Sequence, residues 1–463
     1  MTKLIYPTLD LFLYDLREGF GQTAQEIEHN RQQFMQKLPD TLDQTCFIRR
    51  DEKSFEPEYV ELLDKRIEPL RLPENYPGDG YYYPVRLSDT YGLLLDGSLK
   101  ETQSDDDLTW LKDLHALLKT QIKDKTGTLG QTWLFSAQVP YLPLEQYKAL
   151  AKQCYEVLVP DAVNTDTYPE HSDFLGGNLF EFWRYSGVAT ENHHILIVFY
   201  PDERAAKKGA LFYPGWLRLW MYRHKMMWAY QQSRLLKKRL KEKAIEIQNC
   251  NRAVSQHSIP PLDLKSLQKT LHTAWEVLPR YTTDLSGLDD QTRTIEINLD
   301  NYDKRLNTLR KKAKQEALKL DPFSELVRHK YLRQVQKDHA NLSPGLKLLE
   351  NLIGYIQTMV AIEEEKRERA FQGTIATWGI GLAAGAIVAS VSGQFPTDYD
   401  AYALTRPLNA FLADYLHLPV KWIVPSMSVI LSIGAAIIAG LVTKIFLKTN
   451  LTQRRKGAKV QSH

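Results

Sequence analysis

The run "GTIATWGIGLAAGAIVASVSG", residues 373–393, restricts the fold more than any other part of the sequence. No charged residue occurs between Ala370 and Thr397, and a helix of this length crosses the roughly 30 Å hydrocarbon core of a bilayer. A second uncharged run, "WIVPSMSVILSIGAAIIAGLVT", follows at residues 422–443. Two neighbouring runs of this kind predict two transmembrane helices in the C-terminal part of the chain.

The charges beside these runs predict how the chain is oriented in the membrane. Lys366, Arg367 and Arg369 precede the first run. The connector between the runs carries Asp398, Asp400 and Asp414 against Arg406 and Lys421. Only basic charges follow the second run: Lys444, Lys448, Arg454, Arg455, Lys456 and Lys459. Because basic residues concentrate on the cytoplasmic side, we expect a multi-pass protein of the plasma (inner) membrane with both termini in the cytoplasm.

Small and hydroxyl side chains form a stripe along one face of the first predicted membrane helix. Its members are Thr374, Trp378, Gly381, Gly385 and Ser392. Gly381 and Gly385 form a GxxxG pair, which permits close helix packing. The alternative is that the stripe lines a pore, with hydroxyls facing the ion and Trp378 narrowing the path. Because neither membrane segment carries an ionisable group, packing is the favoured interpretation.

The sequence before the first run predicts a stalk helix that leads into the membrane. Ser343 and Pro344 form a favourable helix start, and no strong breaker follows before Gly393. The apolar face of this helix contains Leu349, Leu352, Ile353, Ile356 and Val360. We therefore expect one helix over 343–393, then an external connector over 394–421, a second membrane helix over 422–447 and a basic tail over 448–463.

Residues 1–213 mix strand and helix patterns and predict a cytoplasmic α/β domain. "LDLFLYDL" at 9–16 and the continuous apolar run at 193–201 are typical of strands, the second of a central one. "YYYPVRLSDTYGLLLDG" at 81–97 indicates strands around a turn at Ser88 and Asp89. Apolar residues at helical spacing predict helices over 108–125 and 144–158.

Residues 214–342 predict a helical or coiled-coil region. One long helix is expected from about residue 214 to the prolines at 260 and 261. Two further helices are expected over 262–277 and 289–320, and a shorter one over 322–338.

Composition indicates that the part outside the membrane is an ordinary folded protein in a reducing compartment. The chain is 25% charged and 43% hydrophobic, with a net charge of +3 that gives no reason to expect a nucleic-acid partner. Three widely spaced cysteines predict neither a disulfide framework nor a zinc site. Walker, GxGxxG and HExxH motifs are absent from the sequence, so we expect no enzyme, and cofactors and metals stay unassigned.

A segment at 213–241, "YPGWLRLWMYRHKMMWAYQQSRLLKKRLK", interleaves aromatic and basic residues. Its ligand-binding candidates are Trp216, Arg218, Trp220, Arg223 and Lys225. Aromatic rings stack on bases and arginines pair with phosphates, so this segment is a candidate site for a nucleotide ligand. The favoured alternative is an amphipathic helix with an aromatic core face and a basic solvated face.

Two compact polar clusters are weaker candidates for a metal or ligand site. They are Glu170, His171 and Asp173 in one, and Glu191, His193 and His194 in the other. Polar residues that flank a strand are the favoured interpretation of both.

The order of these elements resembles the CorA-type metal-ion channel family. The resemblance implies a homo-pentamer in the lipid bilayer, a pore lined by the first membrane helix and a metal cation as the transported species. The family ends this helix with Gly-Met-Asn, whereas Gly393, Gln394 and Phe395 stand at the corresponding outer mouth here. We therefore expect an ion channel or transporter without the standard magnesium filter.

Two other functions remain open on the sequence. CorA-like proteins without the signature are known among nucleotide-gated membrane effectors of antiviral defence, and this chain is similar to them in plan. The last alternative is a non-conducting membrane anchor for a cytoplasmic interaction domain.

Overall fold

A computed structural model describes residues 2–19, 21–52, 58–73, 76–160, 170–185, 192–258, 263–314 and 318–365. The chain divides into two compact units. The first unit comprises Met1–Leu240 and Asp284–Leu342, and the second comprises Lys241–Thr283 and the described residues from Ser343 onward. No helix within the described ranges is both long and apolar enough to cross a membrane.

The C-terminal predictions lie outside the described residues. These are both predicted membrane helices, the connector and the tail, and with them two groups of candidates. The stripe candidates among them are Thr374, Trp378, Gly381, Gly385 and Ser392, and the outer-mouth candidates are Gly393, Gln394 and Phe395.

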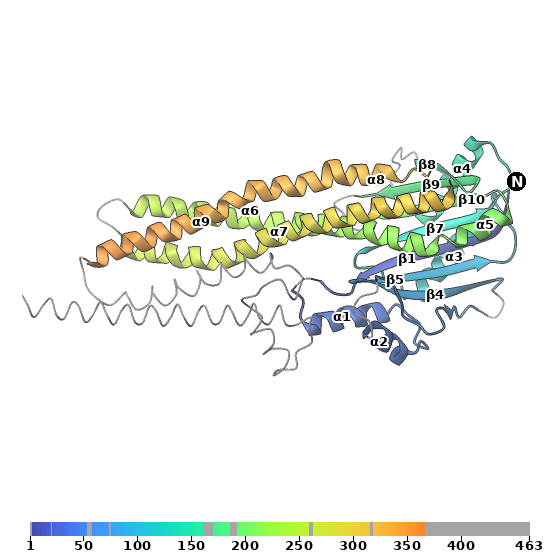
Figure 1. Cartoon of the computed structure of the whole chain (residues 1–463), viewed down its shortest axis with the longest axis horizontal. Helices are drawn as coiled ribbons and strands as arrows, with labels where there is room; N and C mark the ends of the chain where they lie inside the picture. Colours follow the sequence, from blue (N-terminus) through green and yellow to red (C-terminus); the bar gives the residue numbers. More distant parts are fainter. Residues whose placement is uncertain are drawn as a thin grey trace, which may run out of the picture. The chain divides into compact units, whose positions relative to one another are not determined.

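A mixed β-sheet forms the centre of the first unit (Figure 1). The strand order is β2-β4-β5-β1-β7-β10-β9-β8, with β3 beside β4 and β6 beside β1. Strand β10 pairs in parallel with β7 and antiparallel with β9, so it lies inside the sheet. The strands are β1 (Lys3–Leu16), β2 (Val60–Glu61), β3 (Glu68–Pro69), β4 (Gly78–Leu87), β5 (Thr90–Leu99), β6 (Gln103–Ser104), β7 (Gly130–Gln138), β8 (Glu170–Phe174), β9 (Gly177–Arg184) and β10 (His193–Tyr200).

The strand predictions at 9–16, 81–97 and 193–201 are confirmed. The first lies within β1, and the last coincides with β10. The second covers the β4–β5 hairpin, whose turn at Ser88 has a φ of 52°. That left-handed backbone allows the two strands to reverse within two residues.

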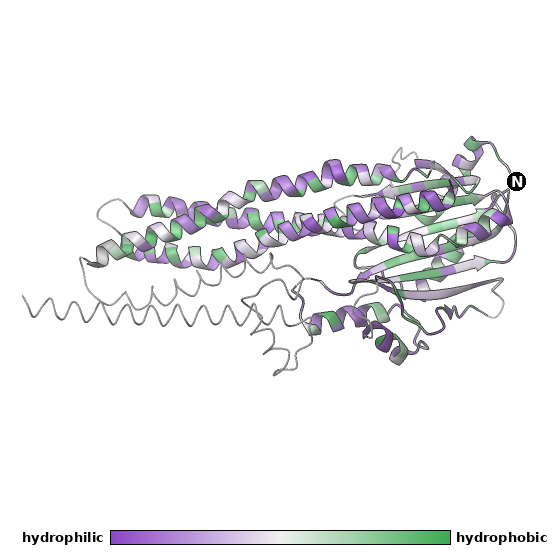
Figure 2. Cartoon of the chain, viewed as in Figure 1, coloured by the Kyte–Doolittle hydropathy of each residue, from purple (hydrophilic) through white to green (hydrophobic). Residues whose placement is uncertain are grey.

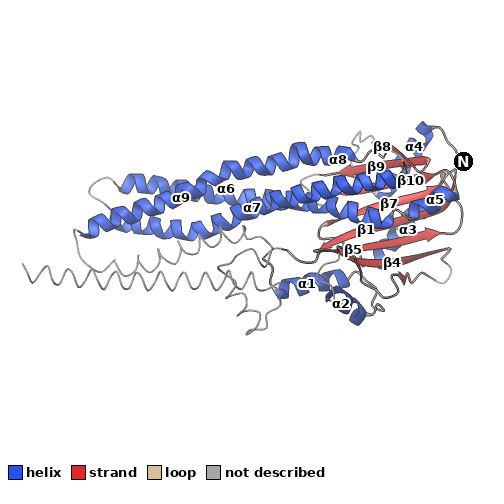
Figure 3. Ribbon diagram, viewed as in Figure 1, coloured by secondary structure: helices blue, strands red, loops and turns tan. Residues whose placement is uncertain are grey.

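One face of the sheet carries the apolar core. Leu9, Leu11 and Leu13 alternate along β1 and are fully buried in this core with side chains of the covering helices. The helices that contribute to this core are α1 (Ala24–Met35), α2 (Gln44–Glu52), α3 (Thr109–Gln121) and α4 (Leu144–Leu158) (Figure 3). The predicted helices at 108–125 and 144–158 are thereby confirmed.

The opposite face of the sheet is covered by α5 (Glu203–Ala210) and the first part of α6 (Tyr213–His257). The remaining residues of β1 alternate toward this side. Tyr14 Oη donates to the Leu217 carbonyl at 2.9 Å, and Tyr213 Oη donates to Asp10. This face therefore holds polar groups that must find partners on α6, because an unpaired buried polar group is costly.

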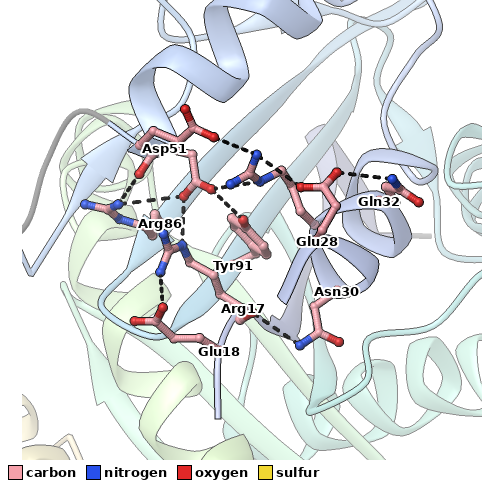
Figure 4. A network of polar contacts seen from close by, with 10 residues as sticks. Arg17, Glu18, Glu28, Asn30, Gln32, Asp51, Arg86 and Tyr91 are labelled. Atoms are coloured by element: carbon pink, nitrogen blue, oxygen red, sulfur yellow. Dashed lines mark hydrogen bonds and ion pairs between the residues drawn. The ribbon is translucent and has the colours of Figure 1, made fainter. Parts of the chain in front are cut away.

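A buried carboxylate attaches α1 and α2 to the β4–β5 hairpin (Figure 4). Asp51 is fully buried and accepts from Arg17 Nε at 2.9 Å and from Tyr91 Oη at 2.7 Å. Arg31 Nε lies 3.3 Å and Arg86 Nη1 3.7 Å from the same carboxylate. The single negative charge of Asp51 is thus shared among three guanidinium groups.

We expect Asp51→Asn to destabilise the protein by about 3–5 kcal/mol, because loss of one buried charge leaves its partners uncompensated. Asp64→Asn is the matched control, since its side chain is 57% exposed although it also pairs with two arginines. The control should lose no more than about 1 kcal/mol. Chemical denaturation measures both, and equal losses for the two variants would contradict the assignment.

The long helices differ from the prediction in one respect. A single helix, α7 (Leu264–Ala313), replaces the two helices expected over 262–277 and 289–320 and runs through Pro279. Buried residues recur along it at steps of three or four, as in a coiled coil. The members of this repeat are Leu267, Leu271, Ala274, Val277, Tyr281, Leu285, Leu288, Thr292, Ile295, Leu299, Tyr302, Leu306 and Leu309. Because this repeat continues on both sides of Pro279, packing offsets the hydrogen bond that the proline removes.

A second proline is likewise inside a helix. The chain forms α8 (Asp321–Leu326), a π-helical segment (Val327–Leu332) and α9 (Arg333–Glu365) without interruption. The expected helix start at Ser343 is therefore wrong, because α9 already begins ten residues earlier and passes through Pro344. Its predicted apolar face is confirmed, with Leu349 and Ile356 fully buried. Figure 2 shows both polar and apolar residues along all three long helices, as amphipathic helices require.

Pro279→Ala should stabilise the protein by about 2 kcal/mol. An interior proline costs a helix about 3 kcal/mol, and its restriction of the unfolded chain returns up to about 1 kcal/mol. Arg280→Ala is the control, because Arg280 is the next residue and is exposed. This variant should change stability by less than about 0.5 kcal/mol. A loss of stability in Pro279→Ala would show that the backbone there is not helical.

Candidate functional site

A group of buried polar side chains lies between the sheet and α6. Strand alternation and register place Thr132 of β7, Glu181 of β9 and His194 of β10 on the side that faces α6. Arg223 and His224 approach them from α6. All five side chains are buried, and none belongs to a residue that is more than 8% exposed.

These side chains form a continuous chain of hydrogen bonds. Arg223 Nη1 lies 3.3 Å from Glu181 Oε1, which lies 2.9 Å from His194 Nε2. His194 Nδ1 and His224 Nε2 each lie 2.8 Å from the Thr132 hydroxyl. One threonine therefore joins two imidazoles from different elements.

The charge of Arg223 fixes the direction of these hydrogen bonds. A carboxylate beside a guanidinium only accepts, so His194 Nε2 carries a proton and donates it to Glu181. His194 Nδ1 then accepts from the Thr132 hydroxyl, whose oxygen accepts from His224 Nε2. Nδ1 of His224 is left as an acceptor beside Gly130, where a Cβ would come within 2.4 Å of that nitrogen.

Burial keeps both imidazoles neutral. Desolvation lowers the pKa of His194 and of His224 well below the ordinary value, and the charge of Arg223 lowers each further. Burial raises the pKa of Glu181, and Arg223 opposes that rise. Both histidines of this hydrogen-bond network are therefore neutral at neutral pH.

Aromatic rings enclose the charged end of this network. The Arg223 guanidinium lies 3.8 Å from the Phe323 ring centroid and 5.2 Å from that of Trp183. Trp220 meets His194 edge-on at 4.9 Å and stacks on Trp216 at 5.4 Å. These rings exclude water, so each polar contact among the buried groups is strengthened.

A cavity of about 270 Å³ opens beside the network. The segment 126–131, Trp183, Asn192 and His193 line it together with Met227 and Gln231 of α6. Arg223, His194 and His224 also reach its wall. Gln131 Oε1 and Glu181 Oε2 are buried without a hydrogen-bond partner among the described residues. The lining mixes polar and apolar side chains, and small-molecule sites usually occupy concave surfaces with converging polar groups.

The structure brings together candidates that the sequence placed in two separate clusters. Trp220 and Arg223 of the aromatic and basic segment meet His194, and His193 lines the same cavity. His193 Nε2 also bonds Tyr155 Oη at 2.8 Å. Neither Thr132 nor Glu181 was predicted as a site residue. No local pattern marks Thr132, whereas the acid within the apolar run "NLFEFW" is a signal that could have identified Glu181.

The remaining ligand-binding candidates of this segment, which lie outside the network, have other partners. Trp216 is buried within the unit, and the Arg218 guanidinium lies 4.5 Å from the Tyr59 ring centroid. Lys225 Nζ pairs with Asp89 at 2.6 Å and so holds the β4–β5 turn. The aromatic core face of the amphipathic interpretation is present, because Trp216 and Trp220 are buried, and Lys238, Arg239 and Lys241 are exposed. Arg223 and Lys225 depart from the expected solvated face, because both are largely buried.

The remaining polar cluster is spread along strand β8. Glu170 and Asp173 are exposed, and His171 Nε2 bonds Asn178 Oδ1 at 2.8 Å. Glu191 lies outside the described residues. Within the part of the chain that the structure describes, no group of three or more His, Cys, Asp or Glu side chains is placed to hold a metal ion.

Comparison with known proteins places the chain in no family: no family profile, no curated protein and no solved structure matches it.

We expect Thr132→Val to destabilise the protein by about 2–4 kcal/mol, because it leaves two buried imidazole nitrogens without their shared partner. Thr120→Val is the control, since the Thr120 hydroxyl is exposed and bonds only a carbonyl of its own helix. It should cost less than about 0.5 kcal/mol. Nitrogen NMR of the wild type should show both histidines neutral with the proton on Nε2. Protonated Nδ1 in His194 would contradict the direction assigned to the chain of bonds.

Proposed function

We propose that this protein is a two-span membrane protein of CorA-like plan that conducts ions as a homo-oligomer. Its first unit is the ligand-sensing part, and the cavity under α6 receives the ligand. The observation that carries the proposal is that helix α6 belongs to both units of the chain. This helix supplies Arg223 and His224 to the cavity, and its residues from Lys241 onward belong to the second unit.

The second unit supports the same proposal through its place in the chain. Helix α9 extends to Glu365, and the uncharged run begins at Gly373. The basic residues 366, 367 and 369 stand between them, as expected at a cytoplasmic membrane surface. A helix of this amphipathic kind in front of a membrane segment suits the transmission of a conformational change.

A nucleotide-gated effector is the second candidate, and the cavity wall favours it over a simple anchor. Trp183 and Tyr185 provide ring surfaces, and Arg184 provides a cationic group beside them. Rings and arginine together are suited to a base and a phosphate. Arg223 contributes less to phosphate binding, since Glu181 already compensates its charge.

Ion flux through liposomes that contain the full-length protein tests the proposal. We expect cation-dependent dye signals above those of empty liposomes, and light scattering in detergent should show an oligomer. Trp378→Ala should raise the flux if the first membrane helix lines the pore, and Ser432→Ala in the second run is the control. Tight liposomes together with a monomer in detergent would support a non-conducting anchor instead.

The same liposomes distinguish the two candidates. Flux that begins only after addition of cyclic or linear nucleotides would identify the nucleotide-gated effector, whereas flux without them would identify a constitutive channel. Arg184→Gln should then weaken the nucleotide response, because it removes a cationic group from the cavity wall.

A further inference from the structure

A second cavity lies on the α6-facing side of the sheet, at the end where α5 and α6 begin. Its volume is about 410 Å³, within the range of small-molecule sites. The rings of Tyr81, Tyr200 and Tyr213 line it, and Ala206 of α5 forms part of the opposite wall. Asp96 of β5 contributes a carboxyl group to this wall.

Asp96 does not stand alone, because the strand register places a second carboxyl beside it. Asp10 of β1 is the direct cross-strand partner of Asp96, so the two side chains share one face at close range. Asp10 is fully buried, and Tyr213 Oη donates to its Oδ2. Its Oδ1 has no hydrogen-bond partner among the described residues, so a proton shared between the two carboxyl groups would satisfy it.

We propose that this cavity binds a small organic cation, an ammonium or guanidinium compound, with the Asp96 carboxylate as its counter-ion and the tyrosine rings as its walls. Two carboxyl groups that share one proton present one negative charge to the cavity. Tyrosine faces attract a cation, and a carboxylate accepts a guanidinium with two parallel hydrogen bonds. A metal ion is disfavoured, because the described residues hold no set of three or more acidic, histidine or cysteine ligands.

The ionisation of Asp96 couples this site to pH. Burial raises the pKa of Asp96 to about 6, and burial together with the neighbouring Asp96 charge raises the pKa of Asp10 well above its ordinary value. Glu203 and Lys207 of α5 also line the cavity but compensate each other at 2.7 Å. The titratable and charged groups that face Asp96 from all neighbouring elements are Asp10, Asp79, Tyr81, Tyr200, Glu203, Lys207 and Tyr213.

Calorimetric titration of the detergent-solubilised full-length protein with agmatine tests this proposal. We expect saturable binding that weakens about tenfold between pH 7.5 and pH 5, because the ionised fraction of a group with a pKa of about 6 falls by that factor. Asp96→Asn should weaken binding at pH 7.5 at least about tenfold, because it removes the counter-ion. Asp113→Asn is the control, because Asp113 is exposed on α3, which covers the other face of the sheet, and lies outside the cavity lining; its effect should be less than about threefold.

Ala206→Phe provides a second variant that leaves every carboxyl group in place and fills the cavity. It should abolish agmatine binding while the thermal unfolding midpoint stays near that of the wild type. No binding to the wild type, or equal binding to Asp96→Asn, would overturn the proposal. Displacement of agmatine by equimolar magnesium chloride would also overturn it and indicate a metal site. None of these readouts depends on ion flux, so they test the cation site independently of the proposed ion conduction.

Discussion

The buried pair of Arg223 and Glu181 is the interaction on which the α6-facing half of the first unit depends. Both side chains are almost completely buried, and Glu181 Oε1 is 3.3 Å from the guanidinium. Removing one partner of a buried pair typically costs about 3–5 kcal/mol, because the other charge is left uncompensated. This constraint fixes the rotation of α6 on the sheet, since a turn of the helix would withdraw Arg223 from its only strand-borne counter-ion in the described network.

The two faces of the sheet therefore differ in the side chains that they bury. The face covered by α1 to α4 is apolar and supplies the main hydrophobic core. The face covered by α5 and α6 contains carboxyl, imidazole and hydroxyl groups, several of which form hydrogen bonds across the helix–sheet interface. Both cavities with candidate ligand chemistry occur on this polar face. Buried ion pairs often stabilise a protein no more than apolar packing would, so these groups support the binding role proposed above.

The sequence predicted the individual helices and strands better than it predicted where a helix continues or which elements contact one another. The apolar run of β10, the β4–β5 hairpin and the helix at Leu144–Leu158 have strong local patterns and were predicted. The prediction ended one helix at residue 277 and began another at Ser343, yet α7 runs through Pro279 and α9 through Pro344. Around Pro279 the buried repeat continues on both sides, so packing there outweighs one lost hydrogen bond. The meeting of Arg223 with His194 depends on the register of three strands, which no local pattern determines.

The central claim is that a ligand-sensing α/β unit and its long helices control an oligomeric pore. A cryo-EM map of the full-length protein in detergent tests this claim most directly. We expect a closed ring of subunits with the first predicted membrane helix next to the symmetry axis, and α6 packed on the polar face of each sheet. A monomer, or an oligomer in which residues 373–393 face only lipid, would contradict it.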